Sequence, residues 1–276
     1  MEMTPVAHIE TDLPQKFCIP RNSFLAPHLQ GRIVFESEFA LPRAVAGLEE
    51  FSHLWLLWEF ENGVPGGAAA DVARDAAAPM RSSDVAPRAA LAEGAPAPAP
   101  GGLYDVESNI APAPPYPDRR WTPTVRPPRL GGSERRGVFA TRSPFRPNPI
   151  GLTCVKLDHI EIVDGAPVIH VLAADLRDGT PIFDIKPYIP FADCHPEATG
   201  GWIDRAPWQE LEVDFPAELR SLVPAPKLAG LIEVLRQDPR RAGSKHEPER
   251  VYHLAYAGLD VAFTVDGESL RVVGIA

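Results

Sequence analysis

The sequence predicts a mainly β protein that ends in a small α+β unit. Short apolar runs separated by turn residues recur along most of the chain, as they do in a β-barrel or a β-sandwich. Helices are few, and the clearest helical period falls at residues 228–235. Three further strand patterns follow that helix toward the C-terminus. These three observations favour a β domain followed by a smaller mixed unit.

The strands of the first part are predicted from their apolar patterns and turns. Residues 51–60 form a nearly unbroken apolar run with several aromatic residues, typical of a strand buried on both faces. Asp164-Gly165 separates two runs, 160–163 and 168–172, which predicts a β-hairpin. Residues 211–215 alternate between apolar and acidic side chains, as in a half-buried strand.

The C-terminal elements follow in order. Leu228, Leu231, Ile232 and Leu235 share one face of a helix that Pro239 ends. Asp266-Gly267 is a turn signal between the last two strands. The predicted strands of this unit are 252–256, 261–265 and 270–273.

We therefore divide the chain into a β-rich domain, residues 1–215, and an α+β unit, residues 216–276. Residues 64–118 interrupt the first domain: of these 55 positions, 16 are Ala and 10 are Pro, and none is Phe or Trp. Such a composition buries too little apolar surface to offset the entropy lost on ordering. We expect a low-complexity insertion that is disordered or loosely packed.

Charge is unevenly distributed. The net charge of -10 opposes non-specific nucleic-acid binding by the whole molecule, yet residues 119–146 hold eight arginines against one acidic residue, Glu134. A local patch of this kind can contact a phosphate backbone, and a merely solvated basic face is the alternative. For Arg240, at the end of the predicted helix, helix capping competes with RNA contact. The candidate RNA-binding residues are Arg126, Arg129, Arg135, Arg136, Arg146 and Arg240.

Cysteine spacing argues against a disulfide framework and against a zinc site, because Cys18, Cys154 and Cys194 are scattered. Asp193-Cys194-His195 invites a metal or thiolate interpretation, but a lone Cys-His pair in a loop is usually neither, and we expect no metal. No apolar run approaches the roughly 18 residues of a membrane span, and the first residues lack a signal-peptide pattern. We expect a cytoplasmic protein.

Residues 137–152, GVFATRSPFRPNPIGL, are the most informative segment of the chain. Three prolines within six positions fix the backbone and make the loop stiff before any ligand arrives. Arg142, Arg146 and Asn148 project from it, and guanidinium groups on a rigid backbone suit a carboxylate or a phosphate. The alternative is a proline-rich connector with solvated arginines.

This segment resembles the hallmark of the TrmO/TsaA-like family of tRNA methyltransferases, which methylate N6-threonylcarbamoyladenosine beside the anticodon. Five further segments resemble the same family in the same order, and the resemblance covers most of the chain outside 64–118. They are FCIPRN at 17–22, GLEEFSHLW at 47–55, RPPRLGG at 126–132, DGTPIFDIKPY at 178–188 and QDPR at 237–240.

The resemblance implies a small β-barrel, tRNA as partner and a homodimer. It implies S-adenosylmethionine as the methyl donor, bound on the barrel; no Gly-x-Gly-x-x-Gly motif signals a Rossmann site. Asn22 stands where relatives more often have Gln, and Glu61-Asn62 where a His-Gln pair can occur. The residues that match donor-contacting positions are Pro20, Arg21, Asn22, Glu61, Asn62, Leu152, Leu172, Ala173, Ala174 and Asp175, with Arg142 as the best carboxylate partner.

Several roles stay open from the sequence. Arg142 could instead pair with Asp175, and Asp178, Asp184 and Lys186 form either a buried ion-pair scaffold or a proton acceptor. His53 is more readily a satisfied core histidine than a base, and no residue is singled out as the catalytic base. The predicted function is a tRNA N6-methyltransferase; the alternative is a β-barrel that binds a nucleotide or RNA without catalysis.

Overall fold

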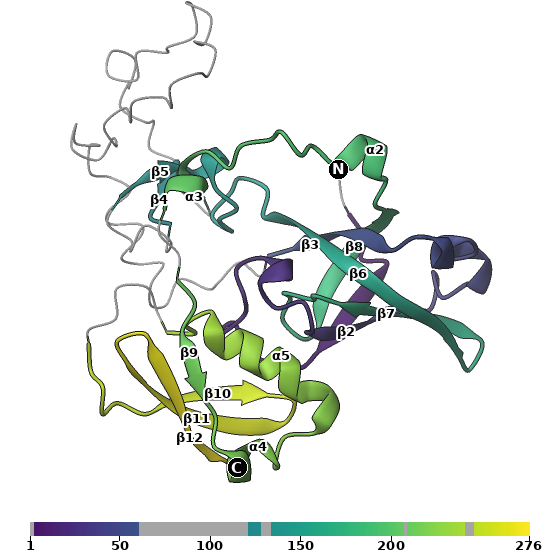
Figure 1. Ribbon diagram of the computed structural model, residues 1–276. Coiled ribbons are helices and arrows are strands. Elements are labelled where there is room, and N and C mark those ends of the chain that lie inside the picture. Colours follow the sequence, from purple (N-terminus) through teal and green to yellow (C-terminus); the bar gives the residue numbers. More distant parts are fainter. Residues whose placement is uncertain (1–2, 61–120, 128–133, 207–208, 241–245) are drawn as a thin grey trace, which may run out of the picture.

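The structure is a computed structural model that describes residues 3–60, 121–127, 134–206, 209–240 and 246–276 (Figure 1). The predicted insertion at 64–118 lies outside these residues. So do three candidate site residues, Glu61, Asn62 and Arg129.

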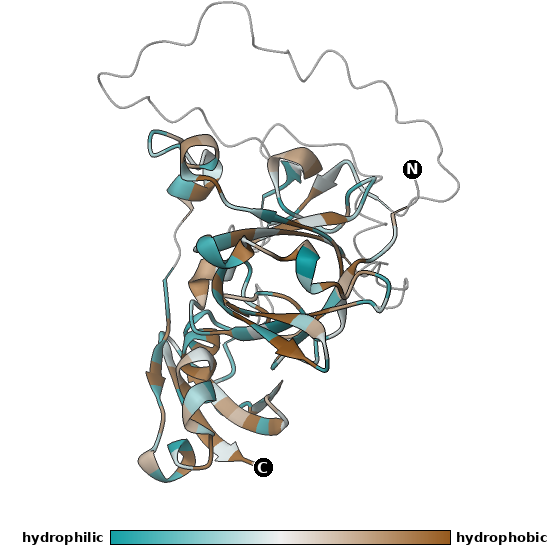
Figure 2. Cartoon of the chain, turned by 90° about the vertical axis from the view of Figure 1, so that its right-hand side faces the viewer, coloured by the Kyte–Doolittle hydropathy of each residue, from teal (hydrophilic) through white to brown (hydrophobic). Residues whose placement is uncertain are grey.

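Six antiparallel strands close into a barrel in the order β1-β2-β7-β6-β3-β8, which confirms the predicted β-barrel. Figure 2 looks into this closed ring, with the C-terminal unit below it. Closure pairs the strands all round and leaves the sheet without an edge. The strands are β1 (Ala7–Thr11), β2 (Gln30–Phe35), β3 (His53–Glu59), β6 (Ile150–Val163), β7 (Ala166–Leu172) and β8 (Thr180–Pro187).

The barrel interior is a packed core. Alternate residues of each strand point inward, and Ile9, Ile33, Leu54, Ile169 and Ile182 are fully buried there. A barrel of so few strands has room only for its own side chains. Any ligand site must therefore lie at the ends or on the outside of this barrel.

The longest strand, β6, belongs to two ladders. Its first half pairs with β3, from Ile150 to Lys156, and its second half pairs with β7 as far as Val163. Asp164 and Gly165 both have positive φ, 51° and 83°, as the predicted tight hairpin requires. The start of β6 thus lies beside the end of β3, and its far end forms a hairpin with β7.

Short elements connect the strands. The described residues include a two-stranded ribbon, β4 (Thr124–Val125) with β5 (Arg136–Gly137). None of the helices among the described residues is long and apolar enough to cross a membrane. The short helices are η1 (Ser23–Leu25), η2 (Pro42–Ala44), η3 (Leu48–Glu50), η6 (Val138–Ala140), α2 (Pro190–Asp193), α3 (Trp202–Arg205) and α4 (Ala217–Arg220).

The C-terminal unit is a four-stranded sheet in the order β10-β11-β12-β9, packed against α5 (Ala225–Arg236). The predicted helix and its three following strands are confirmed. The alternating segment at 211–215 is β9, and it pairs in parallel with β12 in this sheet. The predicted boundary at 215 therefore falls one strand too late, because alternation identifies a strand but not its partner. The strands are β9 (Glu212–Asp214), β10 (Tyr252–Tyr256), β11 (Leu259–Asp266) and β12 (Ser269–Ile275).

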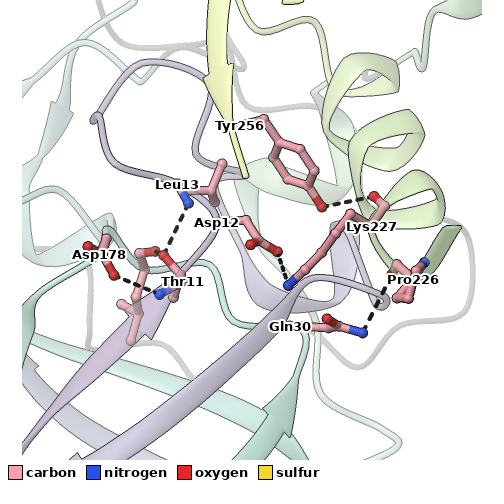
Figure 3. Close-up of polar contacts among 9 residues, drawn as sticks. Thr11, Asp12, Leu13, Gln30, Asp178, Pro226, Lys227 and Tyr256 are labelled. Atoms are coloured by element: carbon pink, nitrogen blue, oxygen red, sulfur yellow. Dashed lines mark hydrogen bonds and ion pairs between the residues drawn. The ribbon is translucent and has the colours of Figure 1, made fainter. Parts of the chain in front are cut away.

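The connection between β1 and β2 belongs to the C-terminal core. Leu13, Cys18, Ala26 and Leu29 are buried in one cluster with residues of α5 and the C-terminal sheet. Figure 3 shows the polar contacts at this junction. They include the ion pair between Lys227 Nζ and Asp12 Oδ2 at 2.7 Å, the hydrogen bond from Tyr256 OH to Lys227 O at 3.0 Å, and the hydrogen bond from Thr11 N to Asp178 Oδ1 at 2.9 Å.

Candidate functional site

A cavity of about 480 Å³ opens where β3 ends and β6 begins, bordered by the β1–β2 connection and the loop at 138–149. We call it the Asp175 cavity. It brings together residues that are far apart in the sequence. Six predicted donor-contacting residues line it: Pro20, Arg21, Asn22, Arg142, Leu152 and Asp175.

Asp175 is an unsatisfied carboxylate on this cavity. Its Oδ1 is inaccessible to solvent and has no hydrogen-bond partner among the described residues. Burial raises the pKa of Asp175 to about 6, although a hydrogen bond from Thr153 and the charge of Arg142 act in the opposite direction. Burial of a carboxylate disfavours its charged form, so a positively charged ligand group beside Asp175 would stabilise the ionised side chain.

A tryptophan supports the floor of the cavity. The Trp58 indole lies over Gly151, where an added Cβ would be 2.2 Å from Trp58 Cε2, so only glycine fits. Trp58 Nε1 donates to Thr153 Oγ1 at 3.1 Å, and Thr153 in turn hydrogen-bonds to Asp175. Our sequence analysis missed the roles of Trp58 and Thr153. The signal that was available is a glycine inside a strand, which often marks a close approach of another group.

Leu172, Ala173 and Ala174 lie behind the cavity wall and do not line it. Ala173 has φ 62°, in the left-handed region that costs a non-glycine residue about 1–3 kcal/mol. Ala174 N donates to Leu29 O at 3.3 Å, which ties this turn to the β1–β2 connection. These residues therefore hold the turn that delivers Asp175.

Arg142 bridges the two walls of the cavity. Its Nη1 donates to Asn22 Oδ1 at 3.2 Å, so the shorter amide at position 22 still reaches its partner. Arg142 lowers the pKa of Asp175 through its charge. Arg142 is exposed and lines both this cavity and its neighbour, which leaves the guanidinium able to contact a ligand.

The loop at 138–149 is stabilised from within. Arg146 Nη1 donates to Thr141 O at 2.6 Å and to Val138 O at 3.3 Å, and its guanidinium lies over the Phe139 ring at 5.6 Å. Thr141 Oγ1 also donates to Val138 O, at 2.8 Å. The stiffness predicted from the prolines thus has a second source, and Arg146 has loop contacts that compete with the predicted contact to RNA.

A second cavity of about 930 Å³ adjoins the first, between the β4–β5 ribbon, the loop at 138–149 and α3. We call it the Trp202 cavity. Phe139, 72% exposed, lies on it beside Trp202, whose Nε1 donates to Ala140 O at 2.8 Å. The two cavities share five lining residues: Arg21, Asn22, Thr141, Arg142 and Pro144.

The predicted arginine patch is partly taken up by internal contacts. Arg126 lines the Trp202 cavity and is exposed. Arg135 is only 8% exposed, and its Nε and Nη2 donate to Thr124 Oγ1 and O, so it stabilises the β4–β5 ribbon. Arg135 also lines the Trp202 cavity, so its contact to RNA stays a prediction that competes with this structural role. Arg136 pairs with Glu134 at 2.6 Å, and Arg240 pairs with Asp238 at 2.8 Å.

Three roles that the sequence left open can be judged from where the side chains lie in the fold. Asp184 and Lys186 form an exposed ion pair at 2.7 Å, so the expected buried scaffold is wrong for this pair. Asp178 accepts a hydrogen bond from Thr11 N and has a structural role. His53 lies on the outer face of β3, half-buried between Phe24 and Tyr188, and does not line either cavity.

Residues 8–92 and 112–194 match the family model described as "tRNA-methyltransferase O N-terminal domain", and residues 208–276 match "TrmO C-terminal domain". The chain belongs to the tRNA-methyltransferase O family. The interruption of the match, at 93–111, is shorter than the insertion predicted at 64–118. The second match begins before β9, in agreement with the sheet.

Relatives in this family carry methyltransferase names. A "tRNA (adenine(37)-N6)-methyltransferase" from Escherichia coli is 35% identical over 87% of this chain and 82% of its own length. A "putative S-adenosylmethionine-dependent methyltransferase RcsF" from Pseudomonas aeruginosa is 31% identical over 99% of this chain and 97% of its own length. The crystal structure of TrmO from Pseudomonas aeruginosa superposes with a TM-score of 0.66 at 27% identity, covering 100% of this chain and 97% of that one.

Proposed function

We propose that the protein is an S-adenosylmethionine-dependent tRNA methyltransferase that methylates N6 of adenosine 37, in the form of threonylcarbamoyladenosine. Membership of the family and the names of its relatives support this function. The observation that carries it is the cavity that brings the Asp175 carboxylate together with Arg142 and Asn22. The alternative, a barrel that binds a nucleotide or RNA without catalysis, does not account for the methyltransferase names of the relatives.

The residues of the Asp175 cavity fit the methyl donor. The α-ammonium of S-adenosylmethionine would pair with the carboxylate of Asp175, which lines this cavity. Its α-carboxylate suits the guanidinium of Arg142, which Asn22 already orients. When bound there, S-adenosylmethionine would supply the methyl group carried on its sulfonium.

The Trp202 cavity suits the acceptor nucleoside. Unstacked RNA bases stack on aromatic side chains, and Phe139 and Trp202 offer such surfaces. Arg126, on the same cavity, can pair with the threonyl carboxylate or with a phosphate. The two cavities share a rim that includes Arg142 and Thr141, so ligands bound in both would lie side by side. Methyl transfer depends mainly on such positioning.

Two experiments test the proposal. Calorimetric titration with S-adenosylmethionine in the presence of a chelator should show binding without metal. Mass spectrometry of tRNA nucleosides, from cells with and without the protein, should show N6-methylated threonylcarbamoyladenosine only in its presence. Donor binding without any change in tRNA nucleosides would favour the non-catalytic alternative. The homodimer and the cytoplasmic location stay predictions.

A further inference from the structure

The β6–β7 hairpin carries two histidines and a glutamate that converge. The ligand atoms of His159, Glu161 and His170 all lie within 4.8 Å of one another. His159 and His170 face each other across the hairpin, with stacked rings 4.1 Å apart at 11°. Glu161 follows His159 by two residues, so both side chains project from the same face of the strand. No other group of at least three such ligands occurs in the described part of the chain.

The spacing of these atoms resembles one edge of a metal site. His170 Nε2 and Glu161 Oε2 are 3.2 Å apart. Two ligand atoms bound to one tetrahedral Zn²⁺ at the usual bond lengths lie about 3.3 Å from each other. His159 is exposed, so a small rotation of its ring can bring its nitrogen toward the same point.

Asp158 prepares His159 for this role. Its Oδ2 lies 2.8 Å from His159 Nδ1, which favours a proton on Nδ1 and leaves Nε2 as a lone-pair donor. Metal-binding histidines typically have their second nitrogen held by a carboxylate in this way. The local register shift between Leu157 and His159 belongs to the same stretch of β6. Asp158 and Glu161 together carry two negative charges, which balance a divalent cation.

We propose that His159, Glu161 and His170 bind one divalent transition-metal ion per chain, with Zn²⁺ as the best match, and that Asp158 positions His159. Water completes the coordination at this accessible surface. The site departs from our expectation of no metal, and it does not use Cys194. His159 is six residues beyond Thr153 on an extended strand, about 20 Å from the Asp175 cavity. The metal therefore fixes the two strands of the hairpin to each other, and donor binding does not need it.

The test uses untagged, full-length protein stripped with a chelator and dialysed. Titration with Co²⁺, followed by its visible absorbance, and with Zn²⁺ against a chromophoric chelator should show one equivalent bound at micromolar protein. Zn²⁺ should raise the Tm of the wild type by a few degrees. Absence of a stoichiometric equivalent for both metals would overturn the proposal and leave the cluster as histidine–carboxylate pairs.

Variants distinguish a specific metal site from non-specific binding of the metal by surface histidines. His159→Gln and His170→Gln should each weaken Zn²⁺ binding by more than about tenfold, and Asp158→Asn by about tenfold to a hundredfold. His253→Gln is the matched control, because His253 pairs with Asp260 at 2.9 Å and belongs to no group of three candidate ligands among the described residues. Glu161→Gln, at an exposed position, serves where a histidine variant fails to fold. Unchanged binding in the hairpin variants, or an equal loss in His253→Gln, would contradict the assignment.

Discussion

The two walls of the Asp175 cavity are built in different ways. The β1–β2 connection, residues 12–29, is anchored by buried side chains such as Leu13 and Leu29 in the core of the C-terminal unit. In the loop at 138–149 Val138 alone is fully buried, and side chains such as Arg146 hold the loop by hydrogen bonds to its own backbone. One wall depends on buried apolar packing, and the other mainly on hydrogen bonds, both within the loop and to neighbouring segments.

The difference indicates two roles for the two halves of the chain. No described residue of the C-terminal unit lines the Asp175 cavity, yet the unit holds the segment that carries Pro20, Arg21 and Asn22. The loop can therefore change its ligand contacts without a change in global stability. Loss of the C-terminal packing should affect stability and donor binding together.

The largest expected effect is a loss of stability when the packing of the β1–β2 connection is weakened. Leu29→Ala should reduce the free energy of unfolding by about 2–5 kcal/mol, because Leu29 is 1% exposed in the C-terminal core. Leu222→Ala, at a position 54% exposed, is the control and should change it by less than about 0.5 kcal/mol. Urea unfolding measures both. Equal, small effects would show that the connection does not depend on this packing.

Asp175 should make both stability and donor affinity depend on pH. Its folded pKa of about 6 lies above the ordinary value of 3.8 for an aspartate, so the folded state binds the proton more tightly. Its contribution to stability therefore falls as pH rises from about 4 to 6, by at most about 3 kcal/mol. The donor's ammonium needs the ionised form, so affinity should rise as pH passes through about 6. Asp175→Asn should lose this rise in calorimetric titrations; the same profile in both proteins would exclude Asp175 as the ammonium partner.

Substitutions in the loop at 138–149 should change activity and leave stability unaltered. Arg142→Lys should fold normally and lose methylation by about tenfold to a hundredfold, because lysine keeps the charge but loses the planar, two-pronged donor group. Arg43→Lys, at an exposed arginine on η2, is the matched control. Methyl incorporation into tRNA, measured beside urea unfolding, gives the comparison. Near-wild-type turnover in Arg142→Lys would remove the recognition role assigned to this arginine.

The smallest effect is expected at the rim of the Trp202 cavity. Arg126→Gln should weaken tRNA binding and lower the slope of log affinity against log salt by about one. Arg135→Gln should instead reduce stability, because Arg135 is buried against Thr124. Binding assays over a range of salt concentrations, with thermal unfolding of each variant, separate the two arginines. An unchanged slope in Arg126→Gln would place the RNA contact elsewhere.

What the sequence could predict depends on the range of the interactions. The Asp164-Gly165 hairpin and the helix α5 follow from neighbouring residues, and both were predicted. The partner of β9 and the burial of Arg135 depend on segments that meet only in the fold, and both were missed.

The candidate site likewise contains residues that local motifs identify and residues that only the fold reveals. The residues at Pro20–Asn22, Arg142 and Asp175 were identified by the resemblance of short motifs, and the structure brings them to one cavity. The support from Trp58 through Thr153 to Asp175 joins three strand and turn positions that no local pattern connects. The inaccessible Oδ1 of Asp175 likewise follows from packing and not from composition.

Amide hydrogen exchange with and without S-adenosylmethionine tests the central claim most directly. Donor binding in the Asp175 cavity should slow exchange across residues 138–153, because several of these residues line the cavity and the loop at 138–149 buries only one side chain fully. The change at residues 12–29 should be smaller, because packing in the C-terminal core already protects that wall, and the hairpin at 158–168 should not change. Unaltered exchange at 138–153 under saturating donor, or protection confined to another part of the chain, would contradict the account.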